Sequence, residues 1–221
     1  MSRVKLTTVK IVCAGPEERL SWRTLEKRSR LNIGVDRGAL TLARAGEEFD
    51  VAIGDFDSVT AGELRLIEEK AKKVIKLDQE KDITDTEAAF AYVLKHAGKK
   101  DVCIDLITPV GGRFDHKLAN ISLMLNYLKK GISEISIEDS SNKIEIYEGE
   151  TDILQRLDHQ YVSFFAIDGV VKNLTLTNVK YPIENYDLAP HDTLCISNEA
   201  SGALIGFKFD SGCLAIIQSN D

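Results

Sequence analysis

The chain has 221 residues, of which 43% are hydrophobic and 29% are charged, and its formal net charge is −7. This length fits one large or two modest domains, and the composition excludes a disordered or fibrous protein. The acidic balance argues against a nucleic-acid-binding protein, which needs basic surface to follow phosphates. An anionic substrate remains compatible with it, because a bound divalent metal inverts the local sign of charge.

The N-terminal part alternates short apolar runs with helical patterns. Strands are predicted over Thr8–Cys13, Asn32–Asp36, Val51–Ile53, Lys73–Leu77 and Val102–Thr108. Helices are predicted over Gly38–Ala45, Ala61–Lys72, Ile83–Ala97 and Phe114–Lys130. Strands that alternate with helices of this length predict βαβ units and an α/β domain with a mostly parallel, Rossmann-like sheet.

The last predicted helix carries one apolar stripe, because Leu118, Ile121, Leu125 and Leu128 recur at three- and four-residue intervals. Gly131 follows at the position where a left-handed C-cap ends a helix. We therefore predict that the α/β domain covers residues 1–131.

The sequence pattern changes after this glycine. The runs EISIED, KIEIYEG, YVSFFAID, NLTLTNV, TLCISN, ALIGFKF and CLAIIQS are short and rich in β-branched or aromatic residues. Turn signals separate them, which is typical of antiparallel strands and hairpins. We predict an all-β sandwich domain over residues 132–221.

No apolar run approaches the roughly 20 residues needed to cross a bilayer, and the N-terminal stretch is too polar for a signal peptide. We therefore expect a cytoplasmic protein with no membrane partner. The four cysteines lack CxxC spacing and lie in apolar, strand-like runs at Cys13, Cys103, Cys195 and Cys213. We expect reduced core thiols, since zinc ligands are grouped differently.

Three predicted strands end in acidic or glycine-rich segments. Asp36 follows the run NIGV, Asp55 and Asp57 follow VAIG, and a Gly111-Gly112 pair follows DLITPV. Ligands of open parallel sheets bind just beyond the carboxyl ends of the strands. We expect the functional site at this edge of the sheet.

Asp55 and Asp57 alternate in an extended segment, so their carboxylates point to the same side. Two hard oxygen ligands of this kind suit Mg²⁺, which takes one or two carboxylates plus phosphate oxygens and water. The alternative is a surface turn in which the side chains bond the local backbone. Both interpretations stay open for this segment alone.

The segment Lys81–Thr86 also combines two roles. Asp82 suits an N-cap, and Asp85 suits the first turn of the following helix, where a negative charge interacts favourably with the helix dipole. The same geometry places two carboxylates beside backbone N–H groups, where a metal–phosphate unit is able to use both. Capping and ligation do not exclude each other.

The third segment is Gly111–His116, which runs into a helix. Paired glycines allow close backbone approach to a ligand, and Arg113 is able to grip phosphate oxygens with two parallel hydrogen bonds. His116 and Asn120 are four residues apart and share a helix face, although His116 is equally well explained as a structural histidine. The acidic edge and this clamp together indicate metal-assisted phosphoryl chemistry. Neither GxxxxGK[ST] nor GxGxxG occurs, so we expect a lineage other than the P-loop or dinucleotide-binding proteins.

These segments, in this order, resemble the thiamine pyrophosphokinase family. The resemblance rests on Asp36–Ala39, Ile53–Ser58, Lys81–Glu87, Gly111–His116, Tyr181–Asn185 and Ser197–Glu199, and it covers almost the whole chain. It implies an enzyme that uses Mg²⁺ and ATP to convert thiamine to thiamine diphosphate, with AMP as the second product. It also implies a homodimer in which ATP and thiamine meet between the α/β domain of one subunit and the β-domain of the other.

The resemblance implies roles for particular residues. The acidic set for Mg²⁺ and phosphate is Asp36, Asp55, Asp57, Asp82 and Asp85, with Asp55, Asp57 and Asp85 as the metal ligands. Arg113 and Asp115 complete the nucleotide site, and Ser197 and Asn198 lie near the thiamine ring. Arg37, Thr86 and His116 belong to the same motifs, and Asn120 follows the last of them on the same helix face as His116. All four are expected to bind ATP or substrate.

As a mechanism, we expect the thiamine hydroxyl to attack the β-phosphorus of ATP while Arg113 offsets the charge on the phosphates. Asp57 or Asp85 is expected to accept the hydroxyl proton. Two rivals remain at this point: a thiamine sensor without catalysis, and an enzyme of the same architecture that acts on another alcohol.

Overall fold

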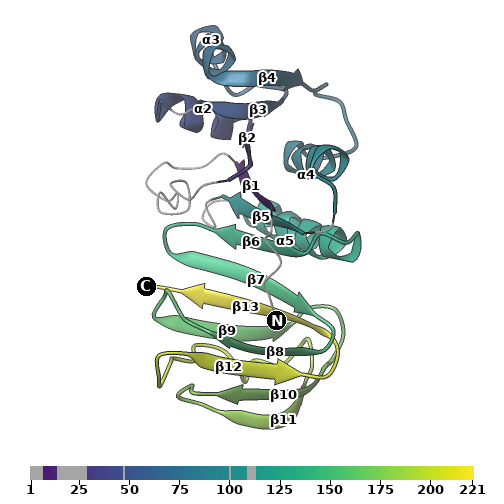
Figure 1. Ribbon diagram of the computed structural model, residues 1–221, viewed down its shortest axis with the longest axis vertical. Helices are drawn as coiled ribbons and strands as arrows, with labels where there is room; N and C mark the ends of the chain where they lie inside the picture. Colours follow the sequence, from purple (N-terminus) through teal and green to yellow (C-terminus); the bar gives the residue numbers. More distant parts are fainter. Residues whose placement is uncertain (1–6, 14–28, 47, 100, 109–112) are drawn as a thin grey trace. The chain divides into compact units, whose positions relative to one another are not determined.

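The computed structural model describes residues 7–13, 29–46, 48–99, 101–108 and 113–221 (Figure 1). The chain divides into two compact units, Met1–Ser140 and Ser141–Asp221. The first unit extends past the predicted boundary at residue 131, because β6 (Glu134–Glu138) pairs in parallel with β5 (Val102–Ile107). The run EISIED was therefore wrongly assigned to the antiparallel domain.

The first unit is built on parallel strands in the order β4-β3-β2-β1-β5-β6. The remaining strands are β1 (Thr7–Val12), β2 (Leu31–Val35), β3 (Phe49–Gly54) and β4 (Ala71–Lys76). Strands β1 and β5 are buried on both faces, which explains their continuous apolar runs. The predicted α/β fold with a mostly parallel sheet is confirmed.

Four helices connect the described strands: α2 (Arg37–Arg44), α3 (Ala61–Lys70), α4 (Asp85–His96) and α5 (Phe114–Lys129). Helix α2 packs with α3, and α4 packs with α5. Right-handed crossovers place the first pair on one face of the sheet and the second pair on the other, as Figure 1 shows for α2 and α4. The direction of winding reverses between β1 and β5, which makes their carboxyl ends the topological switch point of the sheet.

Local capping chemistry sets where the helices begin. Thr60 forms a capping box with Glu63 at the start of α3. The N-cap of α4 is Thr84, whose hydroxyl accepts a hydrogen bond from the backbone N–H of Glu87 at 3.1 Å. The predicted N-cap at Asp82 was therefore wrong, because the helix begins two residues later, although Asp85 does lie in its first turn.

Helix α5 buries a different face from the one its apolar spacing indicated. Its buried residues are Leu123, Met124 and Tyr127, and Tyr127 packs against Phe90 of α4 with ring centroids 4.9 Å apart. Leu118 of the predicted stripe is 52% exposed. The helix therefore has two apolar faces, and only one of them contributes to the core of its own unit.

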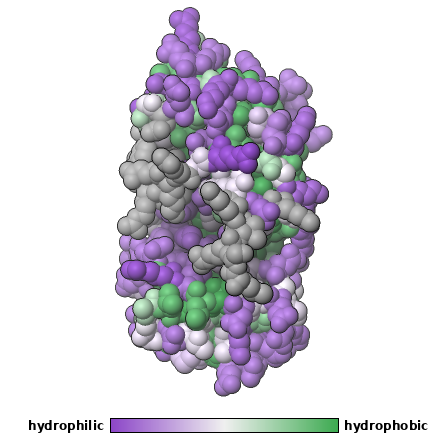
Figure 2. Space-filling view, viewed as in Figure 1, coloured by the Kyte–Doolittle hydropathy of each residue, from purple (hydrophilic) through white to green (hydrophobic). Residues whose placement is uncertain are grey.

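The outer edge of the sheet is protected by charge. Strand β4 has the sequence AKKVIK, and its lysines are exposed. Figure 2 shows hydrophilic side chains over α3 and β4 at the top of the view. Lysines on an edge strand discourage pairing with the edge of another sheet.

The second unit is a β-sandwich of two antiparallel layers, as predicted. One layer has the order β7-β13-β9 and the other β11-β10-β12-β8. The strands are β7 (Asn142–Glu148), β8 (Thr151–Gln155), β9 (Tyr161–Ala166), β10 (Val171–Thr177), β11 (Ile183–Leu188), β12 (Ile205–Phe209) and β13 (Cys213–Ser219).

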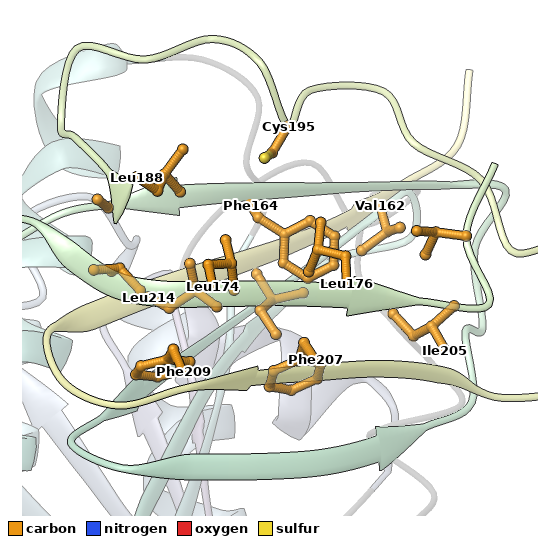
Figure 3. Close-up of a cluster of buried hydrophobic side chains, with 14 residues drawn as sticks. Val162, Phe164, Leu174, Leu176, Leu188, Cys195, Ile205, Phe207, Phe209 and Leu214 are labelled. Atoms are coloured by element: carbon orange, nitrogen blue, oxygen red, sulfur yellow. The ribbon is translucent and has the colours of Figure 1, made fainter. Parts of the chain in front are cut away.

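The two layers of the sandwich meet in one apolar core (Figure 3). Phe164 and Leu214 come from the first layer, and Leu174 and Phe207 come from the second. The rings of Phe164 and Phe207 lie 6.1 Å apart and tilted. Each fully buried side chain of this size contributes about 1.5–3 kcal/mol through removal of apolar surface from water.

All four cysteines are free thiols, and only Cys103 is not fully buried. This agrees with their prediction as reduced core residues. Among the helices of the described residues, none is long and apolar enough to span a membrane.

Close packing of α2 on β1 depends on Gly38. A Cβ atom at this position would lie 2.0 Å from the carbonyl oxygen of Val12, which is backbone and is unable to move aside cheaply. We predict that Gly38→Ala lowers the free energy of unfolding by about 1–3 kcal/mol through overpacking. Urea denaturation followed by circular dichroism measures the change.

Gly62 of α3 is the matched control, because a Cβ atom there would meet nothing within 4 Å. We expect Gly62→Ala to leave stability unchanged or to raise it by up to about 1 kcal/mol. Equal midpoints for Gly38→Ala and the unaltered protein would contradict the packing argument.

Candidate active site

Three described segments meet the carboxyl edge of the first unit's sheet. Cys13 follows β1, Asp36 follows β2, and Asp55 follows β3, which ends at Gly54. Asp36 has a left-handed backbone with φ of 48°, and its N–H donates to the carbonyl of Ile53 at 3.0 Å. Non-glycine residues rarely adopt this conformation, and where they do so the surrounding structure holds them there.

The carboxylate of Asp36 sits against the end of β3. Its Oδ1 accepts the backbone N–H of Phe56 at 3.4 Å. A Cβ atom on Gly54 would fall 1.9 Å from this oxygen, so the glycine provides the space for the carboxylate. Burial, together with the negative charges of Asp85 and Asp55, raises the pKa of Asp36 to about 7.

The segment from Asp55 to Asp57 forms a local turn. Oδ1 of Asp55 accepts the backbone N–H of Asp57 at 3.1 Å, as the turn interpretation of this motif predicts. Phe56 between them is buried with φ of 57°. The side chain of Asp57 is exposed, so the structure does not bring it into the partly buried acidic group of Asp36, Asp55 and Asp85.

Helix α4 delivers the fourth group of the site. Asp85 is its first residue, and Oγ1 of Thr86 lies 3.4 Å from Sγ of Cys13. Burial raises the pKa of the Cys13 thiol to about 12, which keeps it protonated and excludes it as a nucleophile. Asp82 is exposed in the preceding loop. Of the acidic residues in this motif, only Asp85 joins the group at the strand ends.

Sequence reasoning gave no role to Lys81, which lies between two of the acids. Its Nζ is 3.0 Å from Oδ1 of Asp85 and 3.6 Å from Oδ2 of Asp55. Desolvation opposes the charge of this lysine, but the hydrogen bond to Asp85 and the negative charges of both carboxylates outweigh it and raise the pKa of Lys81. The four-residue spacing of helical ion pairs does not mark it, because Lys81 lies in the loop before α4.

The donor atoms around Lys81 fit a divalent cation that also binds phosphate. Oδ1 of Asp85 is buried and faces the ammonium of Lys81 at 3.0 Å. The described residues contain no group of three His, Cys, Asp or Glu side chains arranged to hold a metal ion. A pair of carboxylates is nevertheless the usual protein contribution to Mg²⁺, because phosphates and water complete its shell. Asp55 and Asp85 supply such a pair.

Arg113 immediately precedes α5, and its side chain bonds to Asp115 in the first turn of that helix. It donates from Nε to Oδ1 of Asp115 at 3.2 Å and from Nη2 to Oδ2 at 2.5 Å. This bidentate bond lowers the pKa of Asp115, and both side chains are largely exposed. His116 is exposed and Asn120 half-buried, and no described interaction joins either of them to the acidic group. The predicted Gly111-Gly112 pair lies outside the described residues.

Arg37 is exposed beside the acidic group. Its Nη1 donates to the carbonyl oxygen of Ser58 at 3.0 Å. This bond links the start of α2 to the turn that carries Asp55 and Asp57, so the arginine helps to hold that turn in place.

The second unit has its own polar constellation. Asn198 is buried, and its side chain bonds both the N–H and the carbonyl of Tyr181, at 3.0 and 2.9 Å. Ser197 is exposed with φ of 54°, and its N–H donates to Oγ of Ser163 at 3.0 Å. Asn198 therefore holds two loop segments together, and Ser197 is the exposed member of the predicted pair.

Comparison with known proteins gives an independent result for each unit. The profile of the thiamin pyrophosphokinase catalytic domain matches residues 22–136, and that of the thiamin pyrophosphokinase vitamin B1 binding domain matches residues 141–214. The chain is 37% identical to the thiamine pyrophosphokinase of Bacillus subtilis over 218 residues, which is 98% of this chain and 100% of that protein.

Solved structures agree with this similarity. The crystal structure of the Bacillus subtilis thiamine pyrophosphokinase superposes with a TM-score of 0.84 and covers 97% of this chain and 99% of its own. That of a thiamin pyrophosphokinase family protein from Enterococcus faecalis gives a TM-score of 0.82 at 31% identity over 97% and 99% of the two chains. Thiamin pyrophosphokinase from Candida albicans shares the fold at 16% identity, with a TM-score of 0.80 over 98% and 90%. Because both domain profiles match in order and the similarity to the Bacillus protein spans nearly the whole chain, the chain belongs to the thiamin pyrophosphokinase family.

Proposed function

We propose that the carboxylates at the strand ends carry a Mg²⁺-dependent pyrophosphoryl transfer in this protein. The reaction is that of a thiamine pyrophosphokinase: the thiamine hydroxyl attacks the β-phosphorus of ATP, and thiamine diphosphate and AMP are formed. The observation that supports the site is the pair formed by Asp55 and Asp85 at one cation position, which Lys81 marks. These two carboxylates are the proposed metal ligands.

Mg²⁺ supplies neutralisation of the charge on the ATP phosphates when it is bound. The residues of the chain orient the substrates and accept the proton of the thiamine hydroxyl. Asp57 is exposed and has no ion pair among the described residues, so it is available to a third ligand position or to the hydroxyl proton. Asp85 is the second candidate for this proton. Asp36 accepts the N–H of Phe56 and so helps to fix the turn that carries Asp57.

We propose that Arg113 releases the carboxylate of Asp115 and binds the phosphates of ATP in its place. Its guanidinium already makes a bidentate bond to the carboxylate of Asp115, and phosphate offers the same spacing of two acceptors. The exchange is inexpensive because both side chains are exposed and screened by water. Asp82, Thr86, Arg37, His116 and Asn120 remain predicted contacts of ATP or substrate.

Incubation of the purified protein with ATP, Mg²⁺ and thiamine tests the reaction. Equal amounts of thiamine diphosphate and AMP, abolished by excess chelator, are the expected result. ADP with thiamine monophosphate would mean transfer of a single phosphoryl group. Binding of thiamine without any product would favour a sensor, and turnover of a different alcohol would change the acceptor.

We predict that Asp57→Asn lowers kcat by about 10²–10⁴-fold, because it keeps the side-chain shape and removes a hard charge or a base. The fold should survive, since Asp57 is exposed. AMP formation measures the loss, and a thermal melt followed by circular dichroism checks the fold.

The matched control for this variant is Asp152→Asn, which removes an equally exposed carboxylate from β8 of the second unit. It should keep the activity of the unaltered protein. Near-normal turnover in the Asp57 variant would remove this residue from the mechanism.

We propose further that the second unit contributes to thiamine binding and that two copies of the chain form the complete enzyme. Ser197 is the exposed candidate near thiamine, and Asn198 is proposed to support it. A homodimer is supported by the apolar face of α5 that its own unit leaves uncovered, where Phe114 is 67% exposed. The cytoplasmic location and the absence of nucleic-acid partners remain part of this proposal, in keeping with the charge of −7.

Leu118→Asp tests whether this face of α5 joins two copies. We expect the unaltered protein to sediment as a dimer and the variant as a monomer, because a charge on an apolar interface is left unpaired and desolvated. Leu154→Asp is the control, since Leu154 is also exposed but lies on β8. Sedimentation velocity distinguishes the two. A dimeric Leu118 variant would show that another surface is used.

A further inference from the structure

Lys81 has the position of a cation in the site. Its Nζ faces one oxygen of Asp85 at 3.0 Å and one oxygen of Asp55 at 3.6 Å. The two carboxylates come from different elements, the end of β3 and the start of α4. An ammonium group held between two such carboxylates offsets the repulsion that would otherwise act between them.

This contact differs from the other ion pairs of the unit. The side chain of Lys81 is 17% exposed, and those of Asp55 and Asp85 are 14% and 21% exposed. By comparison, Lys72 pairs with Asp50 at 2.9 Å while 67% exposed. Pairs that are shielded from water are screened less and interact more strongly than pairs on the surface.

The ammonium and a divalent metal are unable to use the same oxygens together. Oδ1 of Asp85 is buried and lies 3.0 Å from the ammonium, so a metal ion at this oxygen would stand in close contact with a like charge. A divalent ion that bound beside a fixed lysine would also be repelled by its charge. Metal binding at these carboxylates therefore requires the lysine to withdraw.

We propose that Lys81 is an internal counter-ion that pairs Asp55 with Asp85 in the metal-free protein and yields this position when Mg²⁺ binds. The inference rests on the metal ligands proposed above. The lysine also has a second partner close by, because its Nζ donates to the carbonyl oxygen of Asp78 at 3.0 Å. It is therefore able to leave the carboxylates and keep a hydrogen bond in the loop before α4. Its role is to position the ligands and to set the affinity for the metal.

The test is binding of Mn²⁺ without nucleotide, followed by electron paramagnetic resonance of the free ion. Lys81→Gln removes the charge and keeps a donor for the Asp78 carbonyl. We expect it to bind Mn²⁺ on the order of tenfold more tightly than the unaltered protein, because no cation has to be displaced. Lys81→Arg should bind Mn²⁺ no more tightly than the unaltered protein, since it keeps the charge.

Lys72→Gln is the matched control, because it removes the same charge from an ion pair outside the site. Its Mn²⁺ affinity should not change. Thermal melting gives a second readout. Lys81→Gln should melt lower than the unaltered protein without metal, and saturating Mn²⁺ should restore more of its stability than it adds to the unaltered protein.

An unchanged or weaker Mn²⁺ affinity in Lys81→Gln would overturn the proposal, as would an equal gain in Lys72→Gln. A Lys81 variant that stays unfolded at saturating Mn²⁺ would overturn it too. The assay for thiamine diphosphate and AMP is separate from this measurement. An active enzyme with unchanged Mn²⁺ affinity would end only the counter-ion role, whereas tighter Mn²⁺ binding in an inactive protein would end only the proposed function.

Discussion

The site depends on holding three carboxylates together at the end of a parallel sheet. Asp36, Asp55 and Asp85 are each only partly exposed, and like charges in such surroundings repel one another and lose hydration. Three separate features offset this repulsion and loss of hydration. A raised pKa lets Asp36 keep its proton near neutral pH, a lysine lies between the other two, and the N-terminus of α4 adds a positive dipole beside Asp85.

The backbone is shaped to allow this arrangement. Asp36 and Phe56 both adopt left-handed conformations that cost roughly 1–3 kcal/mol each for residues with side chains. Gly54 is the third part of the device, because only a residue without Cβ leaves room for the carboxylate of Asp36. The core formed by β1, β3, α2 and α3 holds these positions in place. The packing of this core therefore offsets the backbone strain at the carboxyl edge of the sheet.

The sequence predicted where helices and strands lie better than it predicted how they pair and pack. Alternation of apolar runs and helical patterns located the strands and helices of the first unit and five strands of the second. The run TLCISN was wrongly predicted as a strand, and β8 and β11 were not predicted. The rule for parallel sheets placed Asp36 and Asp55 at the carboxyl edge, where the structure has them. The direction of β6 was not predictable from its own residues, since its apolar run suits a parallel or an antiparallel strand equally well. The face that α5 buries was missed for a similar reason, because both of its faces are apolar.

Side-chain pairing was the less predictable part of the site. The spacing of Asp55 and Asp57 suggested that they act together, yet the turn at Phe56 separates a half-buried carboxylate from an exposed one. The position of Lys81 depends on carboxylates from two different elements, so its own motif does not reveal it. Arg113 was expected to be free for phosphate, whereas a carboxylate two residues away already satisfies it. Local sequence does not reveal such choices, because they depend on which elements the fold brings together.

The charge balance of the site bears on how an anionic nucleotide enters an acidic protein. Three ionised carboxylates would repel the polyphosphate of ATP, and the net charge of −7 gives no long-range attraction. The raised pKa of Asp36 and the position of Lys81 between Asp55 and Asp85 both reduce the negative charge at this edge of the sheet. In the exchange proposed for Lys81, a metal that arrives with its nucleotide would replace one cation by another, so the charges of Asp55 and Asp85 would stay compensated. Under this proposal, the groups that offset the repulsion among the carboxylates also lower the negative charge that the nucleotide meets.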